Sequence, residues 1–214
     1  EQANRPFAGV YWRRGLLLLA FGVTHALFIW AGDVLMMYAL CSFLLLAFRP
    51  LPTRWFVWLG LAAYVMPIGF MLLMGAMGSL LAGTEGWDKA MAQIGVQMQT
   101  LIESERTAYG SGTYAEATWQ RLKSSGMALS NITIFGFIVF GMFLIGAWFV
   151  RSGAIARPRD FPRLYAALRW AALPLGLLAM LGSVALAPTM DFATFNLRVS
   201  SAFTLQMIAN LLMC

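Results

Sequence analysis

The amino-acid sequence predicts an all-α integral membrane protein, a polytopic helical bundle with about six spans. The first observation is composition, because 60% of the 214 residues are hydrophobic and only 11% are charged. A soluble domain of this length could not bury so much apolar surface in one core, so lipid must cover much of it. The second observation is that the apolar residues form long runs separated by short clusters of arginine, as in proteins with cytoplasmic loops.

The first apolar stretch predicts a helical hairpin. It runs from Gly15 to Phe48, and one straight helix of that length would measure about 50 Å against a hydrocarbon core of about 30 Å. Its only break is the Ala-Gly-Asp sequence at 31–33, where glycine permits a turn and aspartate can cap the next helix. We therefore expect two short spans, at residues 15–30 and 34–48.

A cluster of helix breakers at 49–54, Arg-Pro-Leu-Pro-Thr-Arg, then predicts a tight cytoplasmic turn. The third span follows from Trp55 to about Ala82. It contains Pro67, which favours a kink or a tilt. These three spans form the first region of the chain, residues 1–83.

The second region, residues 84–130, predicts an amphipathic loop outside the membrane. It carries five acidic and four basic residues, and its apolar residues between positions 91 and 102 recur at helical spacing. Thr113 and Glu116 have the spacing of a capping box that begins a second short helix. We expect these two helices to lie on the outer membrane surface or over the mouth of the bundle.

The third region, residues 131–214, predicts the last three spans. They cover residues 131–150, 170–187 and 197 onward, with an arginine-rich cytoplasmic loop after the first and a short outer loop at 188–196. The sequence opens at Glu1 without a methionine, and the last apolar run is cut off at Cys214. We therefore expect this sequence to be part of a longer chain.

The positive charges predict the orientation in a bacterial inner membrane. If the amino-terminal end is cytoplasmic, ten of the fifteen lysine and arginine residues fall on the inner side and five on the outer side. This is the usual bias of membrane proteins, and the clustering argues against nucleic acid as a partner. The inner ten are Arg5, Arg13, Arg14, Arg49, Arg54, Arg151, Arg157, Arg159, Arg163 and Arg169.

His25, the only histidine, is the best candidate for chemistry. It lies about 16 Å of helix beyond Arg14, which places it inside the bilayer toward the outer half. Such a histidine either packs through a hydrogen bond to another helix or acts as a general base, nucleophile or proton carrier. Asp33, at the turn, can cap the second helix. If the hairpin folds back, Asp33 can also orient His25 or bind a cation at the outer mouth.

Three further residues are candidates for binding. Tyr38 follows the turn and could contact a substrate, although aromatic residues there commonly anchor a chain at the interface. Arg13 and Arg14 could attract a phosphate-bearing cofactor, although marking the cytoplasmic side also explains them.

Cys41 and Cys214 lie in apolar runs without metal-ligand spacing, so we expect no metal site. No Walker loop, GxGxxG, HExxH or GxSxG pattern occurs.

The run from Arg14 to Leu40, RGLLLLAFGVTHALFIWAGDVLMMYAL, resembles the YeiB-like family of bacterial inner-membrane proteins. That family typically shows an arginine, an apolar run with Gly-Leu-Leu-His, and then Trp-x-Gly-Asp-Ile-Leu-x-x-Tyr-Ala-Leu. Similar sequence continues at 112–116, 120–122 and 143–153. The family's upstream Asp-x-x-Arg-Gly, its Asn-Tyr pair and its Gly-Pro-x-Glu-Trp ending are not in this sequence.

The resemblance implies a relation to membrane acyltransferases, although the YeiB-like family is known chiefly as a domain of unknown function. Such enzymes take an acyl unit from cytosolic acyl-CoA and modify a glycan or another acceptor across the membrane. On this hypothesis His25 is the base or acyl carrier and Asp33 is its orienting partner. The alternatives are a transporter that uses the same two residues for proton or substrate coupling, and a membrane protein without turnover.

Overall fold

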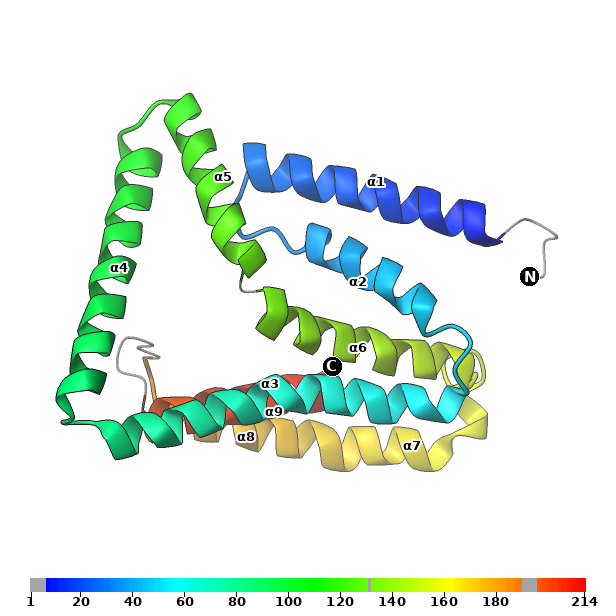
Figure 1. Cartoon of the computed structure of the whole chain (residues 1–214). Helices are drawn as coiled ribbons and strands as arrows, with labels where there is room; N and C mark the ends of the chain where they lie inside the picture. Colours follow the sequence, from blue (N-terminus) through cyan, green and yellow to red (C-terminus); the bar gives the residue numbers. More distant parts are fainter. Residues whose placement is uncertain (1–6, 131, 190–195) are drawn as a thin grey trace. The chain divides into compact units, whose positions relative to one another are not determined.

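The structure, a computed structural model, describes residues 7–130, 132–189 and 196–214 (Figure 1). Every regular element in these residues is a helix, which confirms the predicted all-α class. Three expectations fall outside the described residues: Arg5 as an inner charge, Asn131 as the start of the fourth span, and 190–195 of the outer loop. In chain order the helices are α1 (Phe7–Phe28), α2 (Leu35–Ala47), α3 (Thr53–Leu81), α4 (Glu85–Gly110), α5 (Tyr114–Ser130), α6 (Ile132–Arg151), η1 (Pro158–Asp160), α7 (Pro162–Ala167), η2 (Leu168–Ala172), α8 (Leu173–Leu186) and α9 (Leu197–Met213).

The chain folds into two compact units, each built from two separate segments. The hairpin unit comprises Glu1–Tyr64 and Leu101–Ala147, and the carboxy-terminal unit comprises Val65–Thr100 and Trp148–Cys214. The helices α3, α4 and α6 therefore contribute residues to both units.

In the hairpin unit, α1 and α2 pack against each other as an antiparallel pair (Figure 1). Glycine makes their close approach possible, because a Cβ atom on Gly22 would lie 2.5 Å from the backbone nitrogen of Met36. Gly15 faces Phe43 in the same way, and the Phe43 ring stacks on Trp12 with 4.9 Å between centroids. The chain reverses at residues 29–34, so the helix break includes the Ala-Gly-Asp turn of the sequence.

A second close contact in the hairpin unit joins α3 to α6. A Cβ atom on Gly141 would lie 2.6 Å from the Gly60 carbonyl oxygen, and one on Gly60 would lie 2.9 Å from the Gly141 carbonyl oxygen. Phe56 and Leu144, one turn away on either helix, are fully buried. Small residues at such a crossing let two backbones approach closely, which is a common way for helices to pack in membranes. These two glycines therefore fix the contact between α3 and α6.

The carboxy-terminal unit is built around α8 and α9. The Ser183 hydroxyl donates a buried hydrogen bond of 2.7 Å to the carbonyl oxygen of Ala202, which joins the two helices. Asn196 caps α9 by accepting a hydrogen bond of 3.0 Å from the Val199 backbone nitrogen. Upstream, α7, η2 and α8 form one continuous helical segment, with a π-helical turn at η2. This segment therefore begins eight residues before the predicted fifth span.

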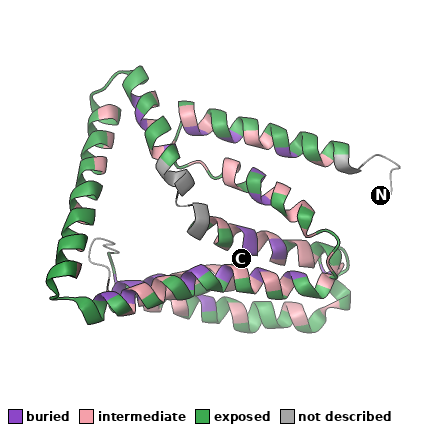
Figure 2. Ribbon diagram, viewed as in Figure 1, coloured by how far each residue is buried: buried purple, intermediate pink, exposed green. Residues whose placement is uncertain are grey.

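Two of the described helical segments, Thr53–Leu81 and Pro162–Leu186, are long and apolar enough to cross a membrane. In the second segment only 6% of the most apolar window is buried, and the ribbon of this segment is mostly exposed (Figure 2). Its Trp170 is 73% exposed. The described parts of two other apolar helices, Leu35–Ala47 and Phe135–Arg151, are shorter than 18 residues. The six-span topology therefore stays a prediction.

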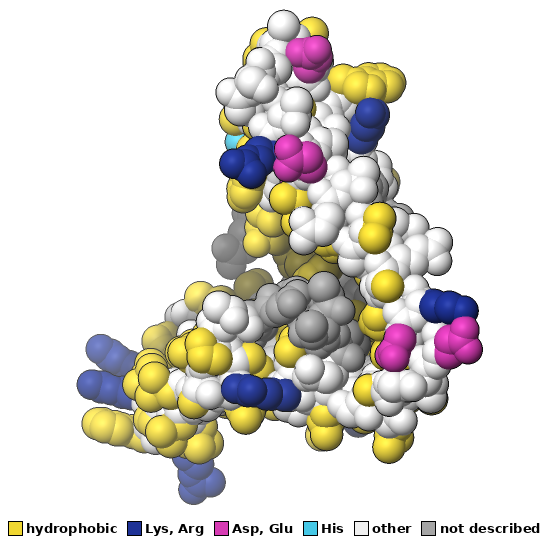
Figure 3. All heavy atoms as spheres, turned by 90° about the vertical axis from the view of Figure 1, so that its left-hand side faces the viewer, with side chains coloured by type: hydrophobic (Ala, Val, Ile, Leu, Met, Phe, Trp, Pro, Cys, Tyr) yellow, Lys and Arg dark blue, Asp and Glu magenta, His cyan; other side chains and the backbone are white. Residues whose placement is uncertain are grey.

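The polar helices α4 and α5 occupy the region, residues 84–130, for which the sequence predicted two amphipathic helices. α4 has no buried residue. In the view of Figure 3, acidic and basic side chains lie beside hydrophobic ones on the surface turned toward the viewer. The predicted capping box at the start of α5 is confirmed. The Thr113 backbone nitrogen donates to Glu116 Oε2 at 2.6 Å, and the Glu116 backbone nitrogen donates to Thr113 Oγ1 at 3.3 Å. The hydrogen bond from the Thr113 backbone holds the pKa of the Glu116 carboxyl below its usual range.

Candidate functional site

The turn between α1 and α2 brings His25 and Asp33 together. The Asp33 carboxylate has a local role, because Oδ1 accepts hydrogen bonds from the backbone nitrogens of Leu35 at 2.8 Å and Met36 at 3.2 Å. Asp33 therefore caps α2, as its position after glycine predicted. This cap fixes the carboxylate at the turn and leaves its second oxygen free to face α1.

That second oxygen, Oδ2, lies 2.7 Å from Nδ1 of His25. The Asp33 side chain is 3% exposed and the His25 side chain 35% exposed, so the carboxylate is buried while part of the imidazole meets solvent. The two atoms lie within contact distance, but the ring is not aligned for a hydrogen bond from Nδ1. A carboxylate at Nδ1 favours a proton on that nitrogen, which leaves Nε2 with its lone pair. The structure thus contains the histidine–carboxylate contact that the sequence considered as one alternative.

The other candidate residues do not join this pair. Tyr38 is partly exposed on α2, and its ring packs on Phe143 of α6 with 5.7 Å between centroids. Arg13 and Arg14 are exposed on α1, about 17 Å of helix before His25. None of these three residues forms a hydrogen bond or an ion pair with His25 or Asp33 in the described structure.

Among the described residues, no group of three or more His, Cys, Asp or Glu side chains could hold a metal ion. Both cysteines are free thiols, with Cys41 buried in α2 and Cys214 exposed.

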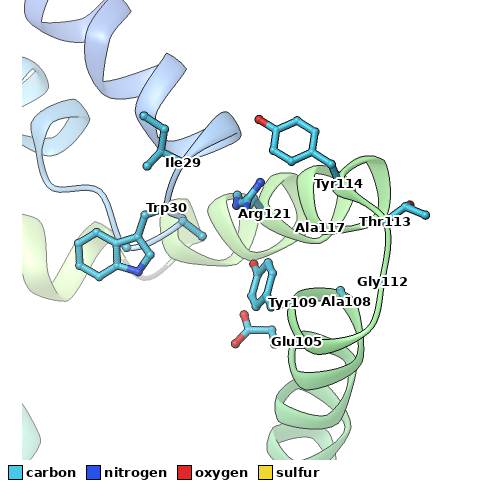
Figure 4. Close-up of a pocket in the computed structure, with 12 residues that line it drawn as sticks. Ile29, Trp30, Glu105, Ala108, Tyr109, Gly112, Thr113, Tyr114, Ala117 and Arg121 are labelled. Atoms are coloured by element: carbon cyan, nitrogen blue, oxygen red, sulfur yellow. The ribbon is translucent and has the colours of Figure 1, made fainter.

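Sequence reasoning missed a cavity in the hairpin unit, which we call the Arg121 cavity. It has a volume of about 560 Å³, within the usual range for small-ligand sites. One wall is the α1–α2 turn, residues 29–32, and the others are the end of α4 and the start of α5 (Figure 4). The Tyr114 hydroxyl donates a hydrogen bond of 2.9 Å to the Phe28 carbonyl oxygen, which ties α5 to this turn. The sequence signal for this cavity is the spacing of Tyr114 and Arg121, which places the two side chains on one face of a helix, two turns apart.

The chain was compared with known proteins. The chain is similar to the uncharacterized protein YxaH of Bacillus subtilis (strain 168), with 31% identical residues over 189 positions. The matched region is 83% of this chain and 44% of YxaH, so the chain spans less than half the length of that relative. No protein-family model matches the chain, and no solved structure matches it.

Proposed function

We propose that this chain is a multi-span protein of the bacterial inner membrane, of the YeiB-like type, with a cytoplasmic amino-terminal end. Four helices beyond the two long segments are candidate spans: α1, α2, α6 and α9. At about 1.5 Å per residue, α6 and α9 measure about 30 and 26 Å, close to a hydrocarbon core of about 30 Å, and the part of α1 that follows Arg14 measures about 21 Å. α2, at about 20 Å, is short and would require local thinning of the bilayer.

Cysteine labelling in intact cells tests this topology. After Cys41 and Cys214 are replaced by alanine, a single cysteine is introduced at Ser111 or at Ala156, both exposed positions. The Ser111 position should react with a membrane-impermeant thiol reagent, whereas the Ala156 position should react only after the cells are opened. The reverse pattern would show that the orientation is wrong.

We further propose that the protein transfers an acyl group from cytosolic acyl-CoA to an extracytoplasmic acceptor such as a glycan. The observation that carries this proposal is the 2.7 Å contact between His25 Nδ1 and the buried Asp33 carboxylate. With Nδ1 protonated, Nε2 can take the proton from an acceptor hydroxyl as its oxygen attacks the thioester carbonyl. The C–O bond forms, the C–S bond breaks, and the proton passes from Nε2 to the departing thiolate.

Arg13 and Arg14 would bind the CoA phosphates in this mechanism, on the cytoplasmic end of the same helix that carries His25. Guanidinium groups suit this role because they donate paired hydrogen bonds to phosphate oxygens. The rise of about 17 Å between these arginines and His25 is a span that the extended pantetheine arm of CoA can cross. One straight helix would then hold both ends of the donor.

The His25→Gln variant tests the catalytic role. Glutamine keeps hydrogen-bonding capacity but cannot act as a base near neutral pH. We expect transfer from labelled acetyl-CoA in membranes to fall at least about 10²-fold, with normal insertion and folding. Near-normal transfer by the variant would remove His25 from the mechanism. If wild-type membranes transfer no tested acyl group, the acyl-transfer proposal fails, and the same His25–Asp33 pair would fit proton-coupled transport instead.

A further inference from the structure

The Arg121 cavity holds two side chains of opposite charge, Arg121 and Glu105, together with exposed aromatic rings (Figure 4). Arg121 extends from α5, and its Cζ atom lies 5.6 Å from the ring centroids of both Tyr109 and Tyr114. The two rings hold the guanidinium by cation–π contact. The hydrogen-bond donors of Arg121 therefore remain for another partner.

Those donors are not used within the described part of the chain. Nη1 of Arg121 is buried and has no hydrogen-bond partner, and no carboxylate of the described residues forms an ion pair with it. A buried guanidinium nitrogen without a partner is unfavourable, because it has lost water without a replacement. The planar guanidinium matches the geometry of a carboxylate or a phosphodiester. Arg121 thus provides a place for an oxyanion.

Glu105 provides the complementary place. Its Oε1 atom accepts a hydrogen bond of 2.6 Å from the Ser124 hydroxyl, which holds the carboxylate on α4 at the cavity wall. A fixed negative charge in the same cavity disfavours a doubly charged ligand such as free phosphate and favours a ligand that also carries a cation.

The indole of Trp30 adds an aromatic face for such a cation. It folds back over Gly32, where a Cβ atom would lie 2.7 Å from its Cζ2 atom, so only glycine allows this ring position. Trp30 is 63% exposed and therefore open to a ligand.

We propose that the Arg121 cavity binds a zwitterionic ligand, with a singly charged oxyanion on Arg121 and an ammonium group near Glu105 and the aromatic rings. Two sources share this chemistry: a free amino acid, and the phosphoethanolamine headgroup of a lipid. The proposal does not rest on acyl transfer or on His25, because it concerns binding alone.

Saturation-transfer NMR, which detects weak ligands, tests the proposal on the full chain in nanodiscs of phosphatidylglycerol, a lipid without an ammonium group. The zwitterionic probes are sn-glycero-3-phosphoethanolamine and L-serine. The control probes are sn-glycerol 3-phosphate, which lacks the ammonium group, and ethanolamine, which lacks the oxyanion. We expect one zwitterionic probe to bind and both controls to bind at least about 10-fold more weakly, and the probe that binds identifies the source.

Matched variants assign the two charges. Arg121→Gln should weaken the bound zwitterion about 10- to 100-fold, the loss expected for hydrogen bonds to a charged group, whereas Arg106→Gln, on the exposed surface of α4, should not. Glu105→Gln keeps an oxygen for Ser124 and should also weaken the zwitterion, which provides a second variant if Arg121→Gln loses helicity by circular dichroism.

Three results would overturn the proposal. The first is that neither zwitterionic probe binds the wild-type chain. The second is that sn-glycerol 3-phosphate or ethanolamine binds as tightly as the zwitterions. The third is that folded Arg121→Gln and Glu105→Gln chains bind the zwitterion as the wild type does.

Discussion

Asp33 performs two separable tasks, and its variants should separate them. Oδ1 caps α2 through the backbone nitrogens of Leu35 and Met36, while Oδ2 faces His25 at 2.7 Å. Asp33→Ala removes both tasks. Asp33→Asn keeps an oxygen for the cap and replaces the charged oxygen, because asparagine caps helices about as well as aspartate.

The expected magnitudes follow from these contacts. Loss of the cap costs about 1 kcal/mol. The contact with His25 adds about 0–1 kcal/mol, since the histidine is 35% exposed and solvent screens the charges. Asp33→Ala should therefore lower the melting temperature by about 2–8 °C, and Asp33→Asn by less than half of that.

Circular dichroism melting of the three chains in one detergent measures these differences. Equal destabilisation by alanine and asparagine would refute the capping role, because only the charge would then matter. In the transfer assay, Asp33→Asn should lose at least about 10²-fold despite its near-normal stability, since it reverses the favoured imidazole tautomer.

Two further predictions concern packing and pH. Gly141→Leu should destabilise the chain by about 1–3 kcal/mol, because a Cβ atom there would meet the α3 backbone at 2.6 Å. Gly146→Leu is the control and should be nearly neutral, since a Cβ atom there has nothing within 4 Å. Thermal melting of both variants checks this. The lowered pKa of Glu116 means that its capping contribution is present above the ordinary value of 4.5 and is lost as pH falls through the folded value. Hydrogen-exchange protection factors at the start of α5, which compare each rate with that of an unstructured chain at the same pH, should therefore fall on acidification in the wild type and change much less in Glu116→Gln. An equal fall in both chains would contradict this cause.

Features that depend on neighbouring residues could be predicted from the sequence. The break at residues 29–34 follows from the length of the apolar run and from the Gly32-Asp33 pair, and the capping box at Thr113 follows from its spacing to Glu116. Both are decided within a few residues, so no knowledge of packing was needed.

Features that depend on packing were not predictable in the same way. Arg121 looked like one more surface charge, because its spacing to Tyr114 does not reveal that Tyr109, on another helix, and the turn at 29–32 also line the cavity. Hydropathy also does not reveal where the helix that contains the fifth predicted span begins. It marks the apolar part of a helix, whereas the helical segment begins within a basic stretch at Pro162, a proline suited to the first turn.

The central claim is that Asp33 holds His25 in the tautomer that leaves Nε2 free to act as a base. Because His25 is the only histidine, ¹⁵N-histidine labelling of the chain gives the NMR signals of one imidazole. We predict that the neutral ring carries its proton on Nδ1 in the wild type, and that Asp33→Asn moves the proton to Nε2. A wild-type ring protonated on Nε2, with a spectrum unchanged by Asp33→Asn, would contradict the account.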